Sequence, residues 1–327
     1  MRLVQNQTNL AVKLTPNIVG VDTHKETLAC WCNGRFKEFP TSLKGFRDAL
    51  KFFPDCIWAI EGAYCFGLAF SSFLISQGCK VYEVNPKLTK AFRGALAVTE
   101  PKNDYGDAKV ISMYAKPENL QTVTLEFIKL KEIITERRFA VKERTRLINN
   151  IKMLSYTRGK ELPFNDLTTQ KAIKWLVNNE DIVLRNQGKI LQTVIETMKE
   201  YEKEIEKNMP EKAERLVELK GVSTVRAVEI FVEIKGKVMS ESQLANYAGI
   251  APVPDSSGKK NRHKNNKNGN RRLNSIIYSL AIMQVRYNEE AKKYYQKKIS
   301  EGCTPRRASK AVQRQLCRII YNLLKDA

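Results

Sequence analysis

Four carboxylate side chains in the first third of the chain have the types and spacing expected of a metal site. Asp22 ends the apolar run Ile-Val-Gly-Val-Asp, and Glu61 ends the apolar run Ile-Trp-Ala-Ile-Glu. A carboxylate at the end of a buried strand is costly unless a cation or hydrogen-bond donors compensate it. Asp104 and Asp107 lie three residues apart, so on a helix they share one face. If that helix packs across a sheet, the four carboxylates converge.

Such a cluster predicts divalent cations, because four negative charges close together repel one another. Oxygen ligands suit Mg²⁺ or Mn²⁺. Two ions of this kind activate the attacking oxygen and stabilise the leaving oxygen in phosphodiester transfer. Each carboxylate also has a structural explanation: Asp22 capping a turn, Glu61 pairing with a lysine, or Asp104 capping the helix that Asp107 begins. One residue alone favours that explanation; the set, in an RNase H-like order, favours metal.

The elements that would position these residues form an α/β pattern over residues 17–115. Short apolar runs alternate with amphipathic segments there, which predicts a mixed sheet. The expected strands are 17–24, 27–32, 35–39, 56–60 and 80–84, and the expected helices are 43–53, 66–76 and 104–114.

Residues 124–207 change to long helical patterns, interrupted by a break at 159–163. Apolar positions recur there at intervals of three, four or seven, which favours an α-hairpin or coiled coil over two ordinary packed helices only slightly. The segment 216–234 is typical either of a helix-hairpin-helix that offers backbone N–H groups to a DNA phosphate or of a plain αα-hairpin. A loop over 252–270 and helices over 271–287 and 306–324 are expected to follow.

The predicted fold class is therefore α/β plus α, in three domains. They are a mixed-sheet domain with the carboxylate site in an RNase H-like order of strands and helices (1–120), which the resemblance described below identifies as RuvC-like, a helical or coiled-coil region (121–210), and a mostly helical C-terminal domain (211–327).

The charge of the chain favours a polyanionic partner. The 327 residues hold 56 Lys and Arg against 35 Asp and Glu, a net charge of +21, of which +14 falls in residues 258–327. Counterion release makes nucleic acid the natural partner, although a merely basic protein has the same composition. No run of 18 apolar residues is present, so no membrane partner is expected. Seven cysteines without a C-x-x-C pair and two histidines make structural zinc improbable and fit a reduced, cytoplasmic environment.

A resemblance to a known family becomes specific at this point. The chain resembles the insertion-sequence transposases with a DEDD carboxylate set, a RuvC-like N-terminal domain and a separate C-terminal transposase domain, which are bridge-RNA-guided serine recombinases. Eight stretches carry the resemblance in the family's order: 20–28 (GVDTHKETL), 61–69, 81–86, 102–108 (KNDYGDA), 219–227, 244–252, 256–258 (SSG) and 268–273 (NGNRRL). The chain departs from the pattern at Asn103 (Ser or Thr expected), Ile250 (Leu) and Asn274 (Arg), which puts nucleic-acid contacts in doubt more than chemistry.

The resemblance implies a second catalytic group and several partners. A serine before a glycine is the family's nucleophile, which implies Ser257 here, with Ser256 as the competitor. A serine hydroxyl needs activation by a base or metal. Donor and target DNA, a guide RNA and an even-numbered homo-oligomer (dimer or tetramer) in a prokaryotic cell are implied as well. A basic run after the serine is expected to contact nucleic acid: Lys259, Lys260, Arg262, Lys264, Lys267, Arg271 and Arg272.

Two other functions remain open on sequence alone. A RuvC-like endonuclease would use metal-activated water and would not need Ser257. A basic RNA-binding or DNA-architectural protein would need neither the serine nor the four carboxylates. The carboxylates lie in the less basic part of the chain, which argues against the second of these alternatives.

Overall fold

The computed structural model describes residues 17–96, 103–116, 120–234, 240–257, 260–266 and 269–325, with only the backbone described from Pro254 to the end of β8. By its internal contacts the chain divides into two compact units, residues 1–128 and 129–327. The three predicted domains remain a prediction, since the second unit covers most of two of them.

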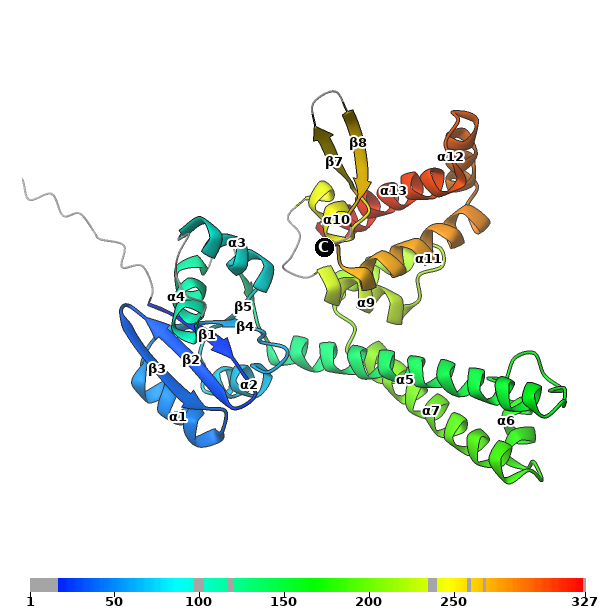
Figure 1. The fold of residues 1–327 in the computed structure, drawn as a ribbon, viewed down its shortest axis with the longest axis horizontal. Helices are drawn as coiled ribbons and strands as arrows, with labels where there is room; N and C mark the ends of the chain where they lie inside the picture. Colours follow the sequence, from blue (N-terminus) through cyan, green and yellow to red (C-terminus); the bar gives the residue numbers. More distant parts are fainter. Residues whose placement is uncertain are drawn as a thin grey trace, which may run out of the picture. The chain divides into compact units, whose positions relative to one another are not determined.

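The first unit is built on a mixed sheet in the order β3-β2-β1-β4-β5-β6 (Figure 1). Strands β1 (Ile18–Thr23), β2 (Thr27–Cys32) and β3 (Arg35–Pro40) form an antiparallel meander, and β4 (Ile57–Glu61) and β5 (Val81–Val84) run parallel to β1. The short β6 (Gln121–Thr122) closes the edge antiparallel to β5. This sheet is compatible with the DEDD RNase H-like fold expected from sequence.

Helices flank the strands at the predicted places, with one addition. Helices α1 (Leu43–Phe52), α2 (Leu68–Ser76) and α4 (Asp104–Tyr114) match the expected segments to within two residues. Helix α3 (Pro86–Leu96) was not predicted. Trp58, Phe53 and Phe70 are fully or almost fully buried and pack edge-to-face beside β4, so aromatic rings fill the core on that side.

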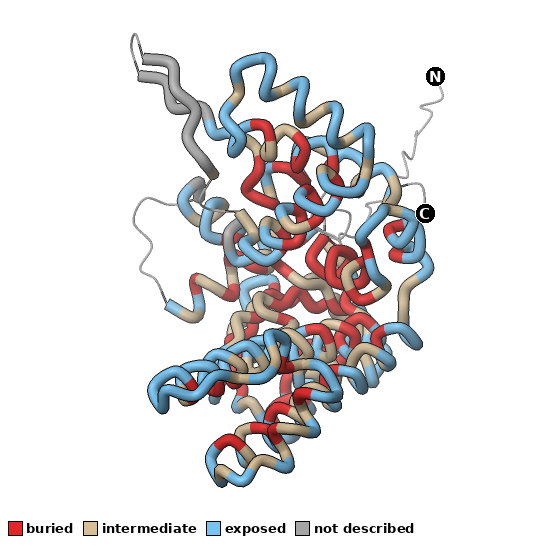
Figure 2. Tube along the Cα trace, turned by 90° about the vertical axis from the view of Figure 1, so that its right-hand side faces the viewer, coloured by how far each residue is buried: buried red, intermediate tan, exposed pale blue. Residues whose placement is uncertain are grey.

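The second unit contains the long helices predicted for its first half. Helix α5 (Leu125–Thr157) begins in the first unit, α6 (Gln170–Val177) follows it, and α7 (Ile182–Lys207) runs back along α5. Buried residues of α7 recur every three, four or seven positions, and more exposed residues lie between them. Figure 2 shows the same alternation of buried and exposed residues along helices of the chain. An α-hairpin is therefore confirmed, while a coiled-coil geometry stays a prediction.

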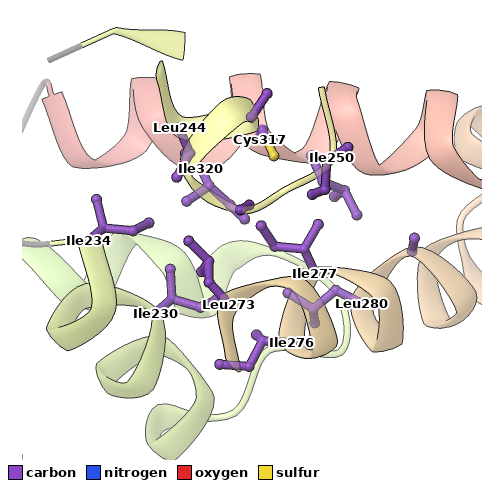
Figure 3. Close-up of a cluster of buried hydrophobic side chains, with 14 of the residues drawn as sticks. Ile230, Ile234, Leu244, Ile250, Leu273, Ile276, Ile277, Leu280, Cys317 and Ile320 are labelled. Atoms are coloured by element: carbon purple, nitrogen blue, oxygen red, sulfur yellow. The ribbon is translucent and has the colours of Figure 1, made fainter. Parts of the chain in front are cut away.

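The remaining helices of the second unit enclose a separate apolar core. Leu216 and Ala213 anchor α8 (Glu211–Glu214) and a 3₁₀ turn, Arg215–Glu218, ahead of α9 (Thr224–Ile234). Buried residues from α9, α10 (Glu241–Tyr247), α11 (Arg271–Tyr287) and α13 (Pro305–Lys325) then meet, and α12 (Glu289–Ser300) contributes Tyr294 and Tyr295 at the margin (Figure 3). The turn at Gly221, with φ +84°, joins this short helical segment to α9 in the hairpin expected at 216–234, while its contact with a DNA phosphate stays a prediction.

The structure corrects the loop predicted over 252–270. Two strands occupy most of it, β7 (Pro252–Ser257) and β8 (Lys260–Asn265), paired antiparallel with Ser257 opposite Lys260. Pro, Asp and Asn have low strand propensity, so the local composition did not indicate a pairing that depends on the partner strand. Among the described residues no helix is long and apolar enough to cross a membrane.

Candidate metal centre and nucleic-acid residues

Two carboxylates and a histidine meet at the end of β1. The Nε2 atom of His24 lies 3.3 Å from Oδ2 of Asp22 and 3.4 Å from Oδ1 of Asp104. Ligand-type atoms of these three residues all lie within 4.8 Å of one another. Asp22 and His24 are two residues apart at the end of a strand, where alternate side chains share a face.

Helix α4 brings Asp104 to the strand because its backbone packs unusually close to β1. A Cβ atom built on Gly20 would lie 2.2 Å from the carbonyl oxygen of Ala108 and 2.3 Å from the nitrogen of Ser112. The Ser112 hydroxyl also donates a hydrogen bond to the carbonyl oxygen of Ile18 (2.7 Å). The absent side chain at position 20 thus fixes the distance between the strand and the helix that carry the carboxylates.

Asn103, one of the departures from the family pattern, begins this helix. Its side chain accepts a hydrogen bond from the backbone N–H of Gly106 (2.8 Å), which makes it the N-cap. Ser, Thr and Asn all fill this position well, so the departure preserves the cap. The proposed capping role for Asp104 is wrong, because Asp104 is the first helical residue after the cap.

Glu61 and Asp107 lie beside the cluster with partners of their own. The register pairs Val21 with Ile60, which places Asp22 and Glu61 at the same end of neighbouring parallel strands. The hydroxyl of the buried Thr89 donates to Oε2 of Glu61 (3.0 Å). Asp107 forms an ion pair with Arg93. Both partners come from α3, the helix that was not predicted.

The electrostatics of Asp22 are those of a carboxylate that gains from a cation. Burial raises the pKa of Asp22, and the negative charge of Asp104 raises it further, while His24 and Arg93 lower it. Burial is the largest of these causes, so the fold stabilises the ionised form of Asp22 less well than water does.

The structure also locates those predicted residues of the second unit that it describes. Ser257 is the last residue of β7, and Arg271 and Arg272 begin α11. Arg272 lies 3.7 Å from the buried Glu233. Three of the predicted basic residues lie in β8, namely Lys260, Arg262 and Lys264. Lys259 and Lys267 lie outside the described residues.

Comparison with known families matches both units. A profile of DEDD transposases of the IS110 type matches residues 19–154, and the profile of the transposase IS116/IS110/IS902 family matches residues 213–296. The chain is a DNA transposase that carries domains of the IS110/IS116 type.

Two insertion-element proteins are similar to this transposase. An uncharacterised 44.8 kDa protein of insertion element IS116 from Streptomyces clavuligerus is 23% identical over 338 aligned positions, 82% of each chain. An uncharacterised 42 kDa protein of IS900 from Mycobacterium paratuberculosis is 28% identical over 118 residues, 35% of the transposase and 30% of that protein.

The carboxylate cluster of the transposase fits a divalent metal ion. Asp22 and Asp104 supply oxygen ligands, and His24 supplies a nitrogen that Mn²⁺ accepts more readily than Mg²⁺ does. Asp107 fits less directly, since a metal ion would compete with Arg93 for its carboxylate.

His24, Arg93 and Thr89 are the site residues that sequence reasoning missed. His24 stands in the Asp-Thr-His stretch that carried the resemblance, and its i, i+2 spacing from Asp22 was the available indication. Nothing local marks Arg93 or Thr89, since their role depends on where α3 lies against the sheet.

Proposed function

We propose that the transposase cuts and rejoins donor and target DNA by phosphodiester transfer, with Asp22, Glu61, Asp104 and Asp107 as the metal site and Ser257 as the nucleophile. The observation that carries the metal half is the convergence of Asp22, His24 and Asp104. The serine half rests on the resemblance and on the position of Ser257 at the end of β7.

The residues then have separate roles. Asp22 and Asp104, with His24, would hold Mg²⁺ or Mn²⁺, and a bound ion would supply Lewis-acid stabilisation of a phosphoryl oxygen. Glu61 and Asp107 extend the negative charge of the site, with Thr89 and Arg93 orienting them. The Ser257 oxygen attacks phosphorus, the bond to the leaving sugar oxygen breaks, and the phosphoserine link conserves the energy of that bond for rejoining.

The partners belong to the same proposal. Donor and target DNA are the substrates, and the basic residues of β8 and the start of α11 contact their phosphates. A structured guide RNA, bound by the N-terminal unit and by α5–α7, selects the sequences. Synapsis of two DNA partners requires an even number of subunits, a dimer or a tetramer.

Trapping the covalent link tests the mechanism. Protein with its co-purified RNA is incubated with DNA and Mg²⁺, and any protein–DNA adduct is mapped by mass spectrometry. We expect the adduct on Ser257, its loss in Ser257→Ala and its persistence in the matched control Ser256→Ala. An adduct elsewhere, or strand joining without one, overturns the serine mechanism.

A metal-dependent endonuclease that uses water is the second candidate, because the observed cluster serves either reaction. Cleavage that survives in Ser257→Ala but is lost in Asp22→Asn identifies the endonuclease. Full activity of Asp22→Asn and Asp104→Asn without added Mg²⁺ contradicts both. Nuclease treatment of the purified protein, followed by addition of the RNA, tests the guide separately.

A further inference from the structure

A groove between α11 and α13 shares Arg271 with the basic run that follows Ser257. It has a volume of about 1130 Å³, above the roughly 300–1,000 Å³ of most small-molecule sites. Its walls come from α11, from the first turns of α13, from Tyr295 of α12 and from residues 248, 249, 266 and 269, all in the second unit. Helices α11, α12 and α13 can be followed in Figure 1. A groove of this size suits a segment of a polymer better than a metabolite.

The groove carries positive charge on both walls. Arg271 and Arg286 line it from α11, and Arg306 and Lys310 line it from α13. None of the described residues that line it is acidic. Burial lowers the pKa of Lys310, and the charge of Arg306 lowers it further. Arg306 and Lys310 thus place two positive charges on adjacent turns of one wall, where an anion in the groove would be attracted to both.

Between the cations the α11 wall is aromatic and aliphatic. Tyr278 is 50% exposed and Ile282 is 41% exposed, and the two lie one helical turn apart on the groove side. Cations that follow a phosphate backbone beside exposed rings that stack on bases are the two components of grooves that bind single strands. A duplex hides its bases and leaves such a ring without a partner.

We propose that this groove binds an unpaired stretch of a DNA strand, with a base stacked on Tyr278 and phosphates bound by Arg286 and Arg306. The choice of DNA rests on the proposed function, because cutting and exchange release a strand from its partner. The groove would hold that strand between its cleavage and its joining to the new partner. Lys310 and Arg271 add positive charge to the lining of the groove.

Binding of a fluorescent oligothymidylate, followed by anisotropy in EDTA, tests the stacking contact without catalysis. Tyr278→Ala is expected to weaken binding by about tenfold, while Tyr278→Phe binds as the wild type does, because the ring supplies the contact. Tyr287→Ala is the matched control, since Tyr287 is 59% exposed on the same helix but does not line the groove. Equal losses for Tyr278→Ala and Tyr287→Ala, or no loss for either, overturn the proposal.

The salt dependence of binding tests the interaction with phosphates. In the double variant Arg286→Gln/Arg306→Gln, the slope of log K against log salt should fall by about 0.7 for each phosphate that the protein no longer neutralises. Lys293→Gln/Lys297→Gln removes two exposed charges from α12 outside the groove and should leave the slope nearly unchanged. Circular dichroism and thermal melting confirm that each variant folds. A slope that falls equally in both doubles contradicts a localised groove.

Two further results separate this proposal from the proposed function. Tighter, Tyr278-dependent binding of an RNA oligonucleotide of matching sequence overturns the assignment to DNA. Normal oligonucleotide binding in every groove variant, with a Ser257 adduct still formed, overturns the groove and leaves the transposase mechanism standing. Oligonucleotide binding that depends on the groove, with no adduct and no strand joining, supports the groove and overturns the proposed transposase mechanism.

Discussion

Replacing Gly20 with alanine should displace the metal site without touching any of its ligands. The added Cβ would lie 2.2 Å from the Ala108 oxygen and 2.3 Å from the Ser112 nitrogen, whereas ordinary contact begins at 3.4 Å. Both atoms are backbone, so α4 has to move away from β1 by about 1 Å. Overpacking of this kind costs about 1–3 kcal/mol of unfolding free energy. Asp104 and Asp107 move with the helix, and a 1 Å misplacement lowers a reaction rate by about a hundredfold.

Strand joining and thermal melting of the same variant provide the assay. Gly94→Ala is the matched control, because a Cβ on Gly94 of α3 meets no atom within 4 Å. Alanine is also the better helix former there, so that variant should be as stable as the wild type or slightly more so. The reasoning fails if Gly20→Ala melts and joins strands as the wild type does, or if Gly94→Ala loses as much as Gly20→Ala.

Two other variants and one labelling experiment test separate features. Asp22→Asn should melt higher than the wild type without metal, because it removes a disfavoured charge, and should lose Mg²⁺ stabilisation and at least about a hundredfold of joining activity. Glu233→Ala should lower the free energy of unfolding by about 3 kcal/mol, because it removes the closer of the two carboxylates that pair with Arg138. The control is Glu301→Ala, which removes a surface ion pair and should change denaturant unfolding little. Alkylation at pH 8, read by mass spectrometry, should label the exposed Cys65 and spare Cys317, whose pKa burial raises to about 12, until the protein unfolds; early labelling of Cys317 contradicts its burial.

The local sequence pattern was sufficient to predict those elements whose own residues indicate which positions are buried. The strands β1 and β2 are apolar runs, and α4 begins at Asp104 as its spacing predicts. Helix α3 was missed although it opens with Asn85-Pro86, residues that are typical of a helix start. The hairpin of β7 and β8 was missed because it depends on pairing between the two strands, and amino-acid composition gives almost no information about that pairing.

The candidate site was predictable in its carboxylates but not in their partners. Asp22 and Glu61 follow from strand ends, and Asp104 from helical spacing. His24 meets both Asp22 and Asp104 only because α4 lies against β1, and that placement depends on the missing side chain of Gly20. Contacts between elements distant in sequence, such as Arg93 with Asp107, have no local indication.

The N-cap at Asn103 also affects how strongly the carboxylates repel one another in the absence of a cation. It places Asp104 and Asp107 in the first turn of α4, where exposed N–H groups and the helix dipole favour negative charge by about 0.3–1 kcal/mol for each residue. Part of the repulsion in the cluster is therefore already relieved by backbone that cannot dissociate. A cation adds less to the folding of this unit than it would at a site without such a helix end. We expect the protein to be folded without metal and the metal to exchange readily. A chelator should therefore inhibit the enzyme reversibly and should not denature it.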